Sequence, residues 1–170
     1  MSRPLVGIIM GSDSDLPVME ESSKVLEKFG VAHEVIVASA HRSPERTRKY
    51  VREAPKRGIK VLIAGAGAAA HLAGMVAAES TLPVIGVPID SSPLNGLDAL
   101  LSTTQMPGGV PVAGMAIGKA GAKNAGVLAA QILALGNKTI NQKLTKYKKD
   151  QAKEVERKSR KLKSDHAGNI

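Results

Sequence analysis

The sequence contains no cysteine and no tryptophan, and its 170 residues include only two tyrosines and one phenylalanine. The absence of cysteine excludes a disulfide framework, a thiolate zinc site and a cysteine nucleophile, and it favours a cytoplasmic location. The three aromatic residues, Phe29, Tyr50 and Tyr147, are too few to stack on a flavin ring or on a run of nucleic-acid bases. We therefore expect a cytoplasmic protein that binds neither.

Long apolar stretches are also missing. No run of 18 uninterrupted apolar residues exists, and the N-terminus lacks a basic segment followed by an apolar run and a cleavage site. The sequence therefore indicates neither insertion into a membrane nor export. With 43% hydrophobic residues, a chain of this length has the material for one domain with a core of ordinary size.

The net charge of +9 is distributed unevenly along the chain. Residues 138–170 carry 11 Lys and Arg against four Asp and Glu, a net charge of +7, whereas residues 1–137 carry 13 against 11. Because these basic residues recur at helical spacings and few aromatic residues accompany them, we interpret the terminal segment as a solvated helix. Salt-dependent RNA binding by the same segment is the alternative.

Apolar runs bounded by glycine alternate with segments of helical periodicity, which predicts alternating strands and helices. The expected strands are residues 5–10, 34–38, 61–64, 84–87 and 110–117. The expected helices are residues 15–29, 44–57, 70–79, 94–101 and 120–135. Because the strands are continuously apolar, residues 1–136 are expected to form one α/β domain with a parallel, doubly wound sheet between helices.

Two further segments bear on assembly. Residues 120–135 are rich in alanine and glycine and have almost no charged face, which favours burial against another subunit and hence an oligomer. Residues 137–163 are expected to form a basic helical extension, and residues 164–170 a disordered tail. A narrow apolar stripe follows the extension and consists of Ile140, Leu144, Tyr147, Val155 and Leu162.

Doubly wound sheets bind ligands outside the carboxyl ends of their strands, so the loops that follow strands are candidate sites. The first such loop runs from Gly11 to Asp15 and offers a tight turn, Ser and Asp side chains that cap a helix, and free amides that attract an anion. It lacks the lysine of a P-loop and the three glycines of a dinucleotide fingerprint. An ordinary N-cap explains this loop equally well.

The second loop places His41 and Arg42 after a strand and before Ser43 and Pro44, which suit an N-cap and the first residue of a helix. Arginine suits bidentate recognition of phosphate, and histidine is the side chain best suited to proton transfer near neutral pH. Their position at the carboxyl end of a strand favours a functional histidine over an ordinary surface histidine.

The third loop, residues 64–75, consists almost wholly of small residues, which let a ligand approach the backbone and expose amides that hold a carboxylate or a planar ring. His71 in this loop contacts the ligand, caps the next helix or packs against that helix. Residues 102–111 contain a double glycine and form either a mobile lid over the ligand or a plain connector.

Five segments taken together resemble the N5-carboxyaminoimidazole ribonucleotide mutase family, and the resemblance covers residues 4–136. They are residues 11–15 (GSDSD), 39–44 (SAHRSP), 65–74 (GAGAAAHLAG), 86–88 (GVP) and 105–112 (QMPGGVPV). The resemblance implies a flavodoxin-like three-layer αβα sandwich that assembles as an octamer with active sites at subunit boundaries. It also implies that the chemistry needs no cofactor and no metal.

The same resemblance implies roles for individual residues. Ser12 and Arg42 would hold the ribose phosphate, Asp15 the ribose hydroxyls, and Ser39 would orient the substrate. His41 would be the general acid and base, while the backbone of residues 66–70 surrounds the migrating carboxylate. The further substrate-binding residues that it implies are Gly11, Ala40, Gly67, Ala68, Ala69, His71 and Leu72.

The family reaction isomerises N5-carboxyaminoimidazole ribonucleotide to 4-carboxy-5-aminoimidazole ribonucleotide in de novo purine biosynthesis. The resemblance implies that protonation of the carbamate nitrogen releases carbon dioxide in a closed pocket and that the ring carbon then captures it, so His41 serves in both directions. Direct carboxylation of aminoimidazole ribonucleotide, by a related branch, is the nearest alternative. A non-catalytic nucleotide- or flavin-binding module on the same fold is the other.

Several positions depart from the family pattern. Ala68 stands where the family commonly has glycine, which adds a methyl group beside the expected carboxylate site. Ala73 replaces a proline, and Thr103 and Thr104 replace Ile and Val, which we interpret as packing changes. Ser43 replaces a threonine and is expected to cap the following helix equally well.

Overall fold

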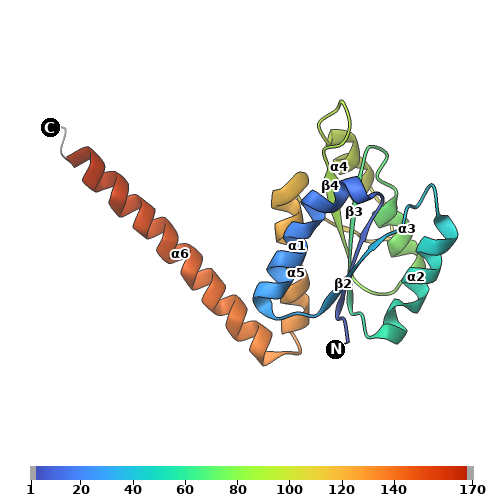
Figure 1. The fold of residues 1–170 in the computed structure, drawn as a ribbon, viewed down its shortest axis with the longest axis horizontal. Helices are drawn as coiled ribbons and strands as arrows, with labels where there is room; N and C mark the ends of the chain where they lie inside the picture. Colours follow the sequence, from blue (N-terminus) through green and yellow to red (C-terminus); the bar gives the residue numbers. More distant parts are fainter. Residues whose placement is uncertain (1–2, 168–170) are drawn as a thin grey trace.

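The computed structural model describes residues 3–167, in which strands and helices alternate along the chain (Figure 1). The strands are β1 (Val6–Met10), β2 (His33–Val37), β3 (Val61–Gly67), β4 (Val84–Ile89) and β5 (Ala113–Gly114). A short 3-10 helix, η1 (Asp13–Asp15), precedes helices α1 (Leu16–Phe29), α2 (Pro44–Arg57), α3 (Leu72–Glu79), α4 (Leu97–Thr104), α5 (Gly118–Ala134) and α6 (Lys138–Ala167). All neighbouring strands pair in parallel in the order β2-β1-β3-β4-β5, which confirms the predicted doubly wound sheet.

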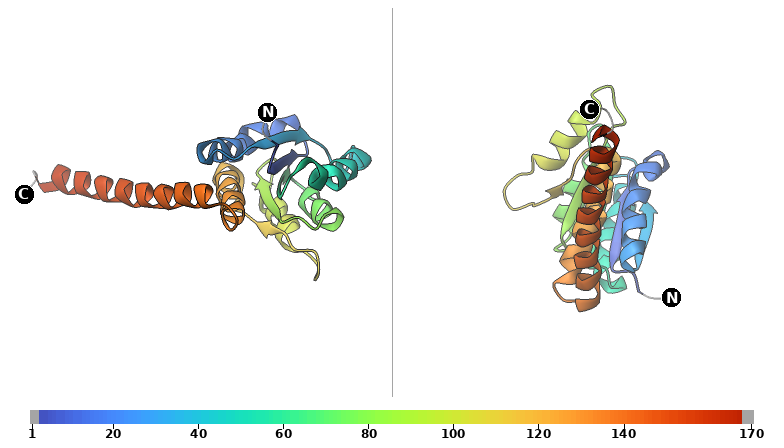
Figure 2. Two further views of the ribbon diagram at one scale, coloured as in Figure 1. Left: turned by 90° about the horizontal axis from the view of Figure 1, so that it is seen from below. Right: turned by 90° about the vertical axis from the view of Figure 1, so that its left-hand side faces the viewer.

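Two hydrophobic clusters cover the two faces of this sheet. One contains Val6, Ile8 and Met10 of β1 together with residues of α1, α5 and the first turns of α6. The other contains Ile9 together with residues of α2 and α3. Because both faces of β1 are covered, all five of its residues are buried, as expected for a continuously apolar strand. The result is the predicted three-layer αβα sandwich (Figures 1 and 2).

The last strand is much shorter than the predicted residues 110–117. Only Ala113 and Gly114 pair with β4. Pro111 lacks the amide proton that a strand donates to its neighbour, and the amide of Val110 donates at 3.2 Å to the carbonyl oxygen three residues earlier, which closes a turn. The segment before β5 is therefore a loop rather than a strand.

The small residues of α5 are explained by close packing inside the same chain. The hydroxyl of Ser22 in α1 donates to the carbonyl oxygen of Ala122 at 2.6 Å. A Cβ atom at Gly126 would lie 2.9 Å from the carbonyl oxygen of Ser22 and from Cβ of Val25, so a larger residue would push the two helices apart. Helix α1 of the same chain covers this side of α5, whereas Val127, Leu128 and Ile132 of α5 are only partly buried, so burial of the remaining apolar surface against another subunit stays a prediction.

Helix α6 packs on the body only through its first turns. Ile140 and Leu144 are buried, and Tyr147 meets Phe29 edge to face with ring centroids 5.4 Å apart. The ammonium group of Lys143 donates to the carbonyl oxygen of Phe29 at 2.9 Å. Beyond these residues the helix extends away from the body (Figures 1 and 2).

The helix also ends later than expected. Residues 164–167, predicted to belong to a disordered tail, continue α6, while residues 168–170 lie outside the described part of the chain. Ion pairs one turn apart, such as Glu154 with Arg157 and Glu156 with Arg160, support the helix along its exposed length. Neither α6 nor any other helix within residues 3–167 is long and apolar enough to cross a membrane.

Candidate active site

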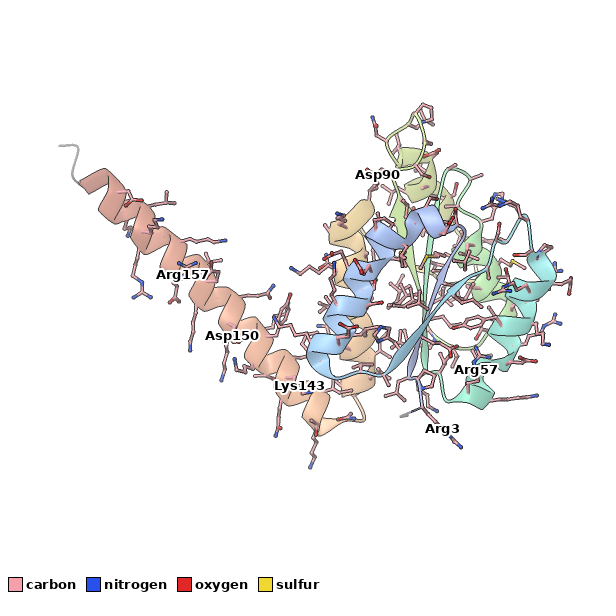
Figure 3. All side chains as sticks on the ribbon, viewed as in Figure 1. Arg3, Arg57, Asp90, Lys143, Asp150 and Arg157 are labelled. Carbon is pink, nitrogen blue, oxygen red and sulfur yellow. The ribbon has the colours of Figure 1, made fainter. Side chains whose placement is uncertain are left out.

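A cavity of about 440 Å³ opens at the carboxyl ends of four neighbouring strands. Asp90, which directly follows β4, marks this edge of the sheet in Figure 3, whereas Arg3 and Arg57 lie toward the opposite edge. The cavity is lined by Gly11, Ser12, Ser14, Asp15, Ser39, Ala40, His41, Arg42, Ala66, Gly67, Ala69, His71, Leu72 and Ser91. The fold thus brings together every predicted site residue except Ala68, which is not among the lining residues.

The loop after β1 is held by two reciprocal hydrogen bonds. The amide of Ser14 donates to Oγ of Ser12 at 3.3 Å, and the amide of Ser12 donates to Oδ2 of Asp15 at 3.1 Å. The side chain of Asp15 is buried, and this burial raises the pKa of its carboxyl. Hydrogen bonds from the backbone amides of Ser12 and Gly11 lower this pKa but do not cancel the effect of burial. Ser12 therefore caps the helical turn that follows it, and it also lines the cavity.

The loop after β2 is tied to α2 and to the first loop. The amide of Ser39 donates to Oγ of Ser43 at 3.0 Å, and the amide of Arg42 donates to Oγ of Ser39 at 3.1 Å. The guanidinium of Arg42 reaches across to the carbonyl oxygen of Gly11 at 3.0 Å. Ser43 is the N-cap residue of α2 and Pro44 its first helical residue, as predicted, but the hydroxyl of Ser43 donates to the carbonyl oxygen of Ser39 and makes no cap hydrogen bond, which corrects the expected capping by this side chain.

The loop after β3 turns sharply into α3. Ala68 has a φ of +50°, in the left-handed region that favours glycine, so its backbone is strained. The amides of Ala70 and His71 donate to the carbonyl oxygens of Ala68 and Ala69 at 2.8 and 2.7 Å. Ala69 and His71 line the cavity, whereas Ala68 does not.

Two histidines from different loops meet in this cavity. Nε2 of His41 lies 2.6 Å from Nδ1 of His71, and the rings are edge to face with centroids 4.8 Å apart. At this distance one nitrogen donates a proton and the other accepts it, so the tautomer of each ring depends on the other. The side chain of His71 makes no cap hydrogen bond to α3, so helix capping is excluded, and contact of His71 with the ligand stays a prediction.

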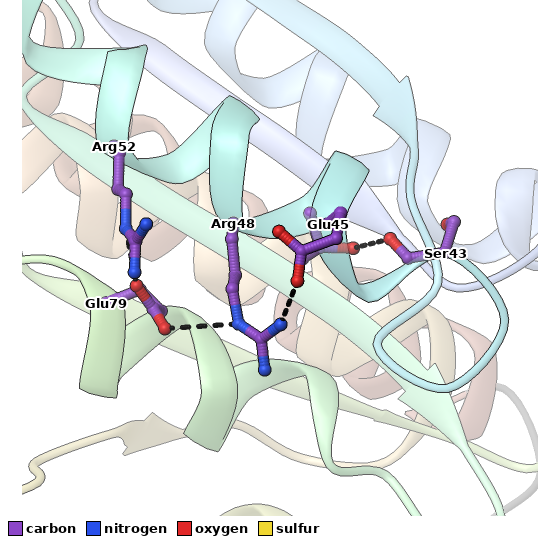
Figure 4. Close-up of polar contacts among 6 residues, drawn as sticks. Ser43, Glu45, Arg48, Arg52 and Glu79 are labelled. Carbon is purple, nitrogen blue, oxygen red and sulfur yellow. Dashed lines mark hydrogen bonds and ion pairs between the residues drawn. The ribbon is translucent and has the colours of Figure 1, made fainter.

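Ion pairs join the two helices that begin just after these histidines. Glu79, at the end of α3, accepts from Nε of Arg52 at 2.8 Å and lies 3.4 Å from Nε of Arg48 (Figure 4). Arg48 also pairs with Glu45 in its own helix. These contacts hold α2 against α3 and so support the loops that carry the histidine pair.

Two loops add to what the sequence indicated. Ser91, two residues after β4, lines the cavity and was not predicted, although the rule that ligands bind beyond strand ends identifies its loop. Residues 102–111, for which a lid and a connector were the alternatives, do not line the cavity, which agrees with the connector. They lead into the amino end of β5, and Gly109 and Pro111 border a separate cavity of about 510 Å³ beside Pro83.

Known proteins are similar to this chain in sequence and in fold. Residues 5–154 match the family described as AIR carboxylase. The chain is 57% identical over 160 residues to N5-carboxyaminoimidazole ribonucleotide mutase of Pyrococcus horikoshii, which covers 94% of this chain and 89% of that protein. It is 54% identical over 162 residues to phosphoribosylaminoimidazole carboxylase of Candida glabrata, which covers 95% of this chain and 28% of that protein. The crystal structure of Treponema denticola PurE matches with a TM-score of 0.85 and 31% identity, over 95% of this chain and 99% of that one. The chain therefore belongs to the AIR carboxylase family.

Proposed function

We propose that this protein isomerises N5-carboxyaminoimidazole ribonucleotide to 4-carboxy-5-aminoimidazole ribonucleotide in de novo purine biosynthesis. The observation that carries this function is the hydrogen-bonded pair of His41 and His71 inside a cavity built from the loops after four strands. Family membership and similarity to a mutase along nearly the whole chain support it. A chain without cysteine suits the reducing cytoplasm, where we place the protein.

The ribose phosphate of the substrate binds between the first two loops. Arg42 uses one N–H group on Gly11 and keeps its other donors for the phosphate, while Ser12 lines the same cavity. Asp15, on the same turn as Ser12, accepts hydrogen bonds from the ribose hydroxyls, and Ser39 orients the nucleotide from the second loop. These contacts direct the carboxylated imidazole toward the histidine pair.

His41 acts first as an acid and then as a base at the reacting atoms. Protonation of the carbamate nitrogen breaks its bond to the carboxylate carbon, the bonding electrons stay on nitrogen, and carbon dioxide is released. The nucleophilic ring carbon forms a new bond to that carbon dioxide, and loss of the proton on this carbon restores the aromatic ring. One proton is delivered and one is removed, so His41 is regenerated, and the contact with His71 lets a proton pass between the two rings.

The carbon dioxide must neither escape nor be hydrated before it is captured. Gly67, Ala69 and their small neighbours form a wall that fits closely around a small molecule and leaves little room for water once the substrate is bound. Helix α3 begins at Leu72 on the same wall. Its free N-terminal amides stabilise the carboxylate before and after the transfer.

The nearest alternative is direct carboxylation of aminoimidazole ribonucleotide. Substrate with an isotopic label in its carboxylate, incubated in excess unlabelled bicarbonate, distinguishes the two activities. An isomerase retains most of the label in the product and needs no bicarbonate, whereas a carboxylase depends on bicarbonate and incorporates unlabelled carbon. We expect retention of the label, and its complete replacement would contradict the proposed isomerisation.

The composition of the cavity disfavours the other alternative, a flavin- or nucleotide-binding module without catalysis. The only rings among the lining residues are the imidazoles of His41 and His71. Phe29 of α1 and Tyr147 of α6 contact each other, and Tyr50 of α2 is buried in the cluster between α2 and the sheet. A colourless purified protein that converts the ribonucleotide would exclude this alternative.

The assembly that supports these sites is a homo-octamer with active sites at subunit boundaries. Val155 and Leu162 continue the apolar stripe of α6 beyond the body and are 67% and 59% exposed. A second group of exposed leucines consists of Leu94, which precedes α4, and of Leu97 and Leu101 in α4. Exposed apolar patches of this kind mark interaction surfaces. The mass of the purified protein in solution, expected at eight times that of one chain, tests the assembly.

A further inference from the structure

Ser91 is the only lining residue of the cavity that comes from the loop after β4. Its amide donates to the carbonyl oxygen of Ile89 at 3.0 Å, which fixes the backbone where the strand ends. The next turn is also closed, because Oγ of Ser92 accepts a hydrogen bond from the amide of Leu94 at 3.2 Å. Ser91 is thus held in a defined loop at the cavity, and the mechanism above does not use it.

The side chain of Ser91 lies directly against Gly67, the last residue of β3. A Cβ atom at Gly67 would lie 1.7 Å from Oγ of Ser91 and 3.1 Å from the carbonyl oxygen of Ile89, the residue opposite Gly67 in β4. The hydroxyl therefore occupies the space that any side chain at position 67 would need. Glycine at position 67 and serine at position 91 together form this part of the cavity wall.

The hydroxyl of Ser91 has its hydrogen-bonding capacity free for a ligand. The other serines that line the cavity, Ser12, Ser14 and Ser39, each use their hydroxyl in a hydrogen bond to the protein. Within residues 3–167, no protein group bonds to the hydroxyl of Ser91. A serine hydroxyl offers one donor and two acceptor positions, so this side chain can meet an anion or a polar group of the substrate.

We propose that the hydroxyl of Ser91 donates a hydrogen bond to the migrating carboxylate. The inference rests on the proposed function and adds a substrate contact from the fourth strand. In that function the loop that starts at Gly67 surrounds the carboxylate, and Ser91 touches Gly67. A carboxylate accepts a stronger hydrogen bond than neutral carbon dioxide, so the contact stabilises substrate and product more than the intermediate between them. Its contribution is therefore to binding rather than to the rate of the chemical step.

Two ribonucleotides that differ only in the carboxylate test this assignment, 4-carboxy-5-aminoimidazole ribonucleotide and aminoimidazole ribonucleotide. Ser91→Ala should weaken calorimetric binding of the carboxylated ligand by about tenfold, because one hydrogen bond to a charged group is lost, and leave the affinity for the other unchanged. In steady-state turnover KM should rise and kcat should not fall, because the contact is weaker in the carbon dioxide intermediate than in the bound substrate. Ser92→Ala, at the neighbouring serine outside the cavity lining, is the matched control and should change neither affinity.

Each possible result bears either on the assignment of Ser91 or on the proposed function. Equal weakening of the two ribonucleotides would place the contact on the shared ribose phosphate and overturn the assignment, as would unchanged binding of both. The substitution removes one oxygen from an exposed loop, so the melting temperature of Ser91→Ala should equal that of the wild type and show that any loss is local. Wild-type protein that binds neither ribonucleotide would contradict the proposed function and this assignment together. If the wild type binds both and Ser91→Ala shows no selective loss of affinity for the carboxylated ligand, the assignment alone is contradicted.

Discussion

Nε2 of His41 and Nδ1 of His71 lie 2.6 Å apart, although 30 residues separate the two histidines in the sequence. Strands β2 and β3, which precede them, do not pair with each other, because β1 lies between them in the sheet. The contact therefore requires the loops after β2 and β3 to reach toward each other across the carboxyl end of β1. It joins two imidazoles between which a proton can move without passing through solvent.

Replacement of the proton carrier gives the most direct test of this pair. His41→Asn should lower turnover of N5-carboxyaminoimidazole ribonucleotide by about a thousandfold, since asparagine neither donates nor accepts a proton in the reaction, while product affinity changes little. Steady-state rates and calorimetry measure the two quantities. His33→Asn is the matched control, because His33 contacts the carbonyl oxygen of Val31 outside the cavity lining and should leave the rate unchanged. Near-normal turnover by His41→Asn would overturn the mechanism.

The second histidine should matter less than the first. His71→Asn removes the partner that shares a proton with His41, but a water molecule can take its place, so we expect turnover to fall by about tenfold to a hundredfold. Because the two rings act as one unit, the double variant should be no slower than His41→Asn alone. Additive losses in the double variant would show that the two residues act independently.

Local sequence patterns predicted the parts of the fold that depend on neighbouring residues. Helix α2 begins at Pro44 and ends at Arg57 as expected, because proline starts it and a glycine in the left-handed conformation follows it. The first three loops of the cavity were likewise predictable, since each directly follows an apolar strand, whereas the roles of most single residues in them were implied only by the family resemblance. The extent of β5 was not, because it depends on which backbone amides find partners on β4.

Contacts between distant loops lie beyond local patterns for the same reason. The strand order decides which loops become neighbours, and no periodicity in the sequence encodes it. The meeting of His41 with His71 and the packing of Ser91 on Gly67 both depend on that order. The close packing of α5 on α1 is another case, since an alanine-rich helix has the same composition whether its own chain or a second subunit covers it.

Burial of Asp15 gives the stability of the protein a pH dependence of defined sign. A carboxyl whose pKa is higher in the folded than in the unfolded state contributes stability below its unfolded pKa and loses that contribution as the pH rises through the folded pKa. Asp15→Asn removes this titration and keeps an acceptor for the amide of Ser12. The melting temperature of the variant relative to wild type should therefore be higher at neutral pH than under acidic conditions. Asp13→Asn, exposed on the same turn, is the control, and a difference for Asp15→Asn that does not vary with pH would contradict the expectation.

The strained backbone at Ala68 predicts a stabilising substitution. A non-glycine residue in the left-handed region costs about 1–2 kcal/mol, whereas glycine adds about 0.5–1 kcal/mol of unfolded-state entropy, so Ala68→Gly should raise the free energy of unfolding by roughly 0.5–1 kcal/mol. For a chain of this size the melting temperature should rise by about 2 °C. Ala69→Gly is the matched control, because its φ is not positive and only the entropic cost remains. A lower melting temperature for Ala68→Gly would show that no strain is relieved at this position.

The apolar stripe of α6 tests the proposed assembly. Val155 lies 11 residues after Leu144, and Leu162 lies 22 residues after Ile140. Since three turns of helix contain about 11 residues, both exposed side chains continue the face that packs on the body. An isolated helical segment gains little stability in water, so this half of α6 needs a partner to cover its apolar side chains. Replacement of both Val155 and Leu162 by asparagine should therefore shift the protein to species of lower mass.

Light scattering after size-exclusion chromatography measures that mass, and the opposite face of the helix supplies the control. Lys149 and Lys153 are exposed and lie about half a turn away from the apolar stripe, so asparagine at these positions changes composition and helix propensity without touching the stripe. If the stripe forms the interface, only the Val155 and Leu162 variant loses mass, and its catalytic rate falls if the sites lie at subunit boundaries. Equal masses for both double variants would mean that α6 makes no contact on which the assembly depends, and the interface would then have to lie on the body.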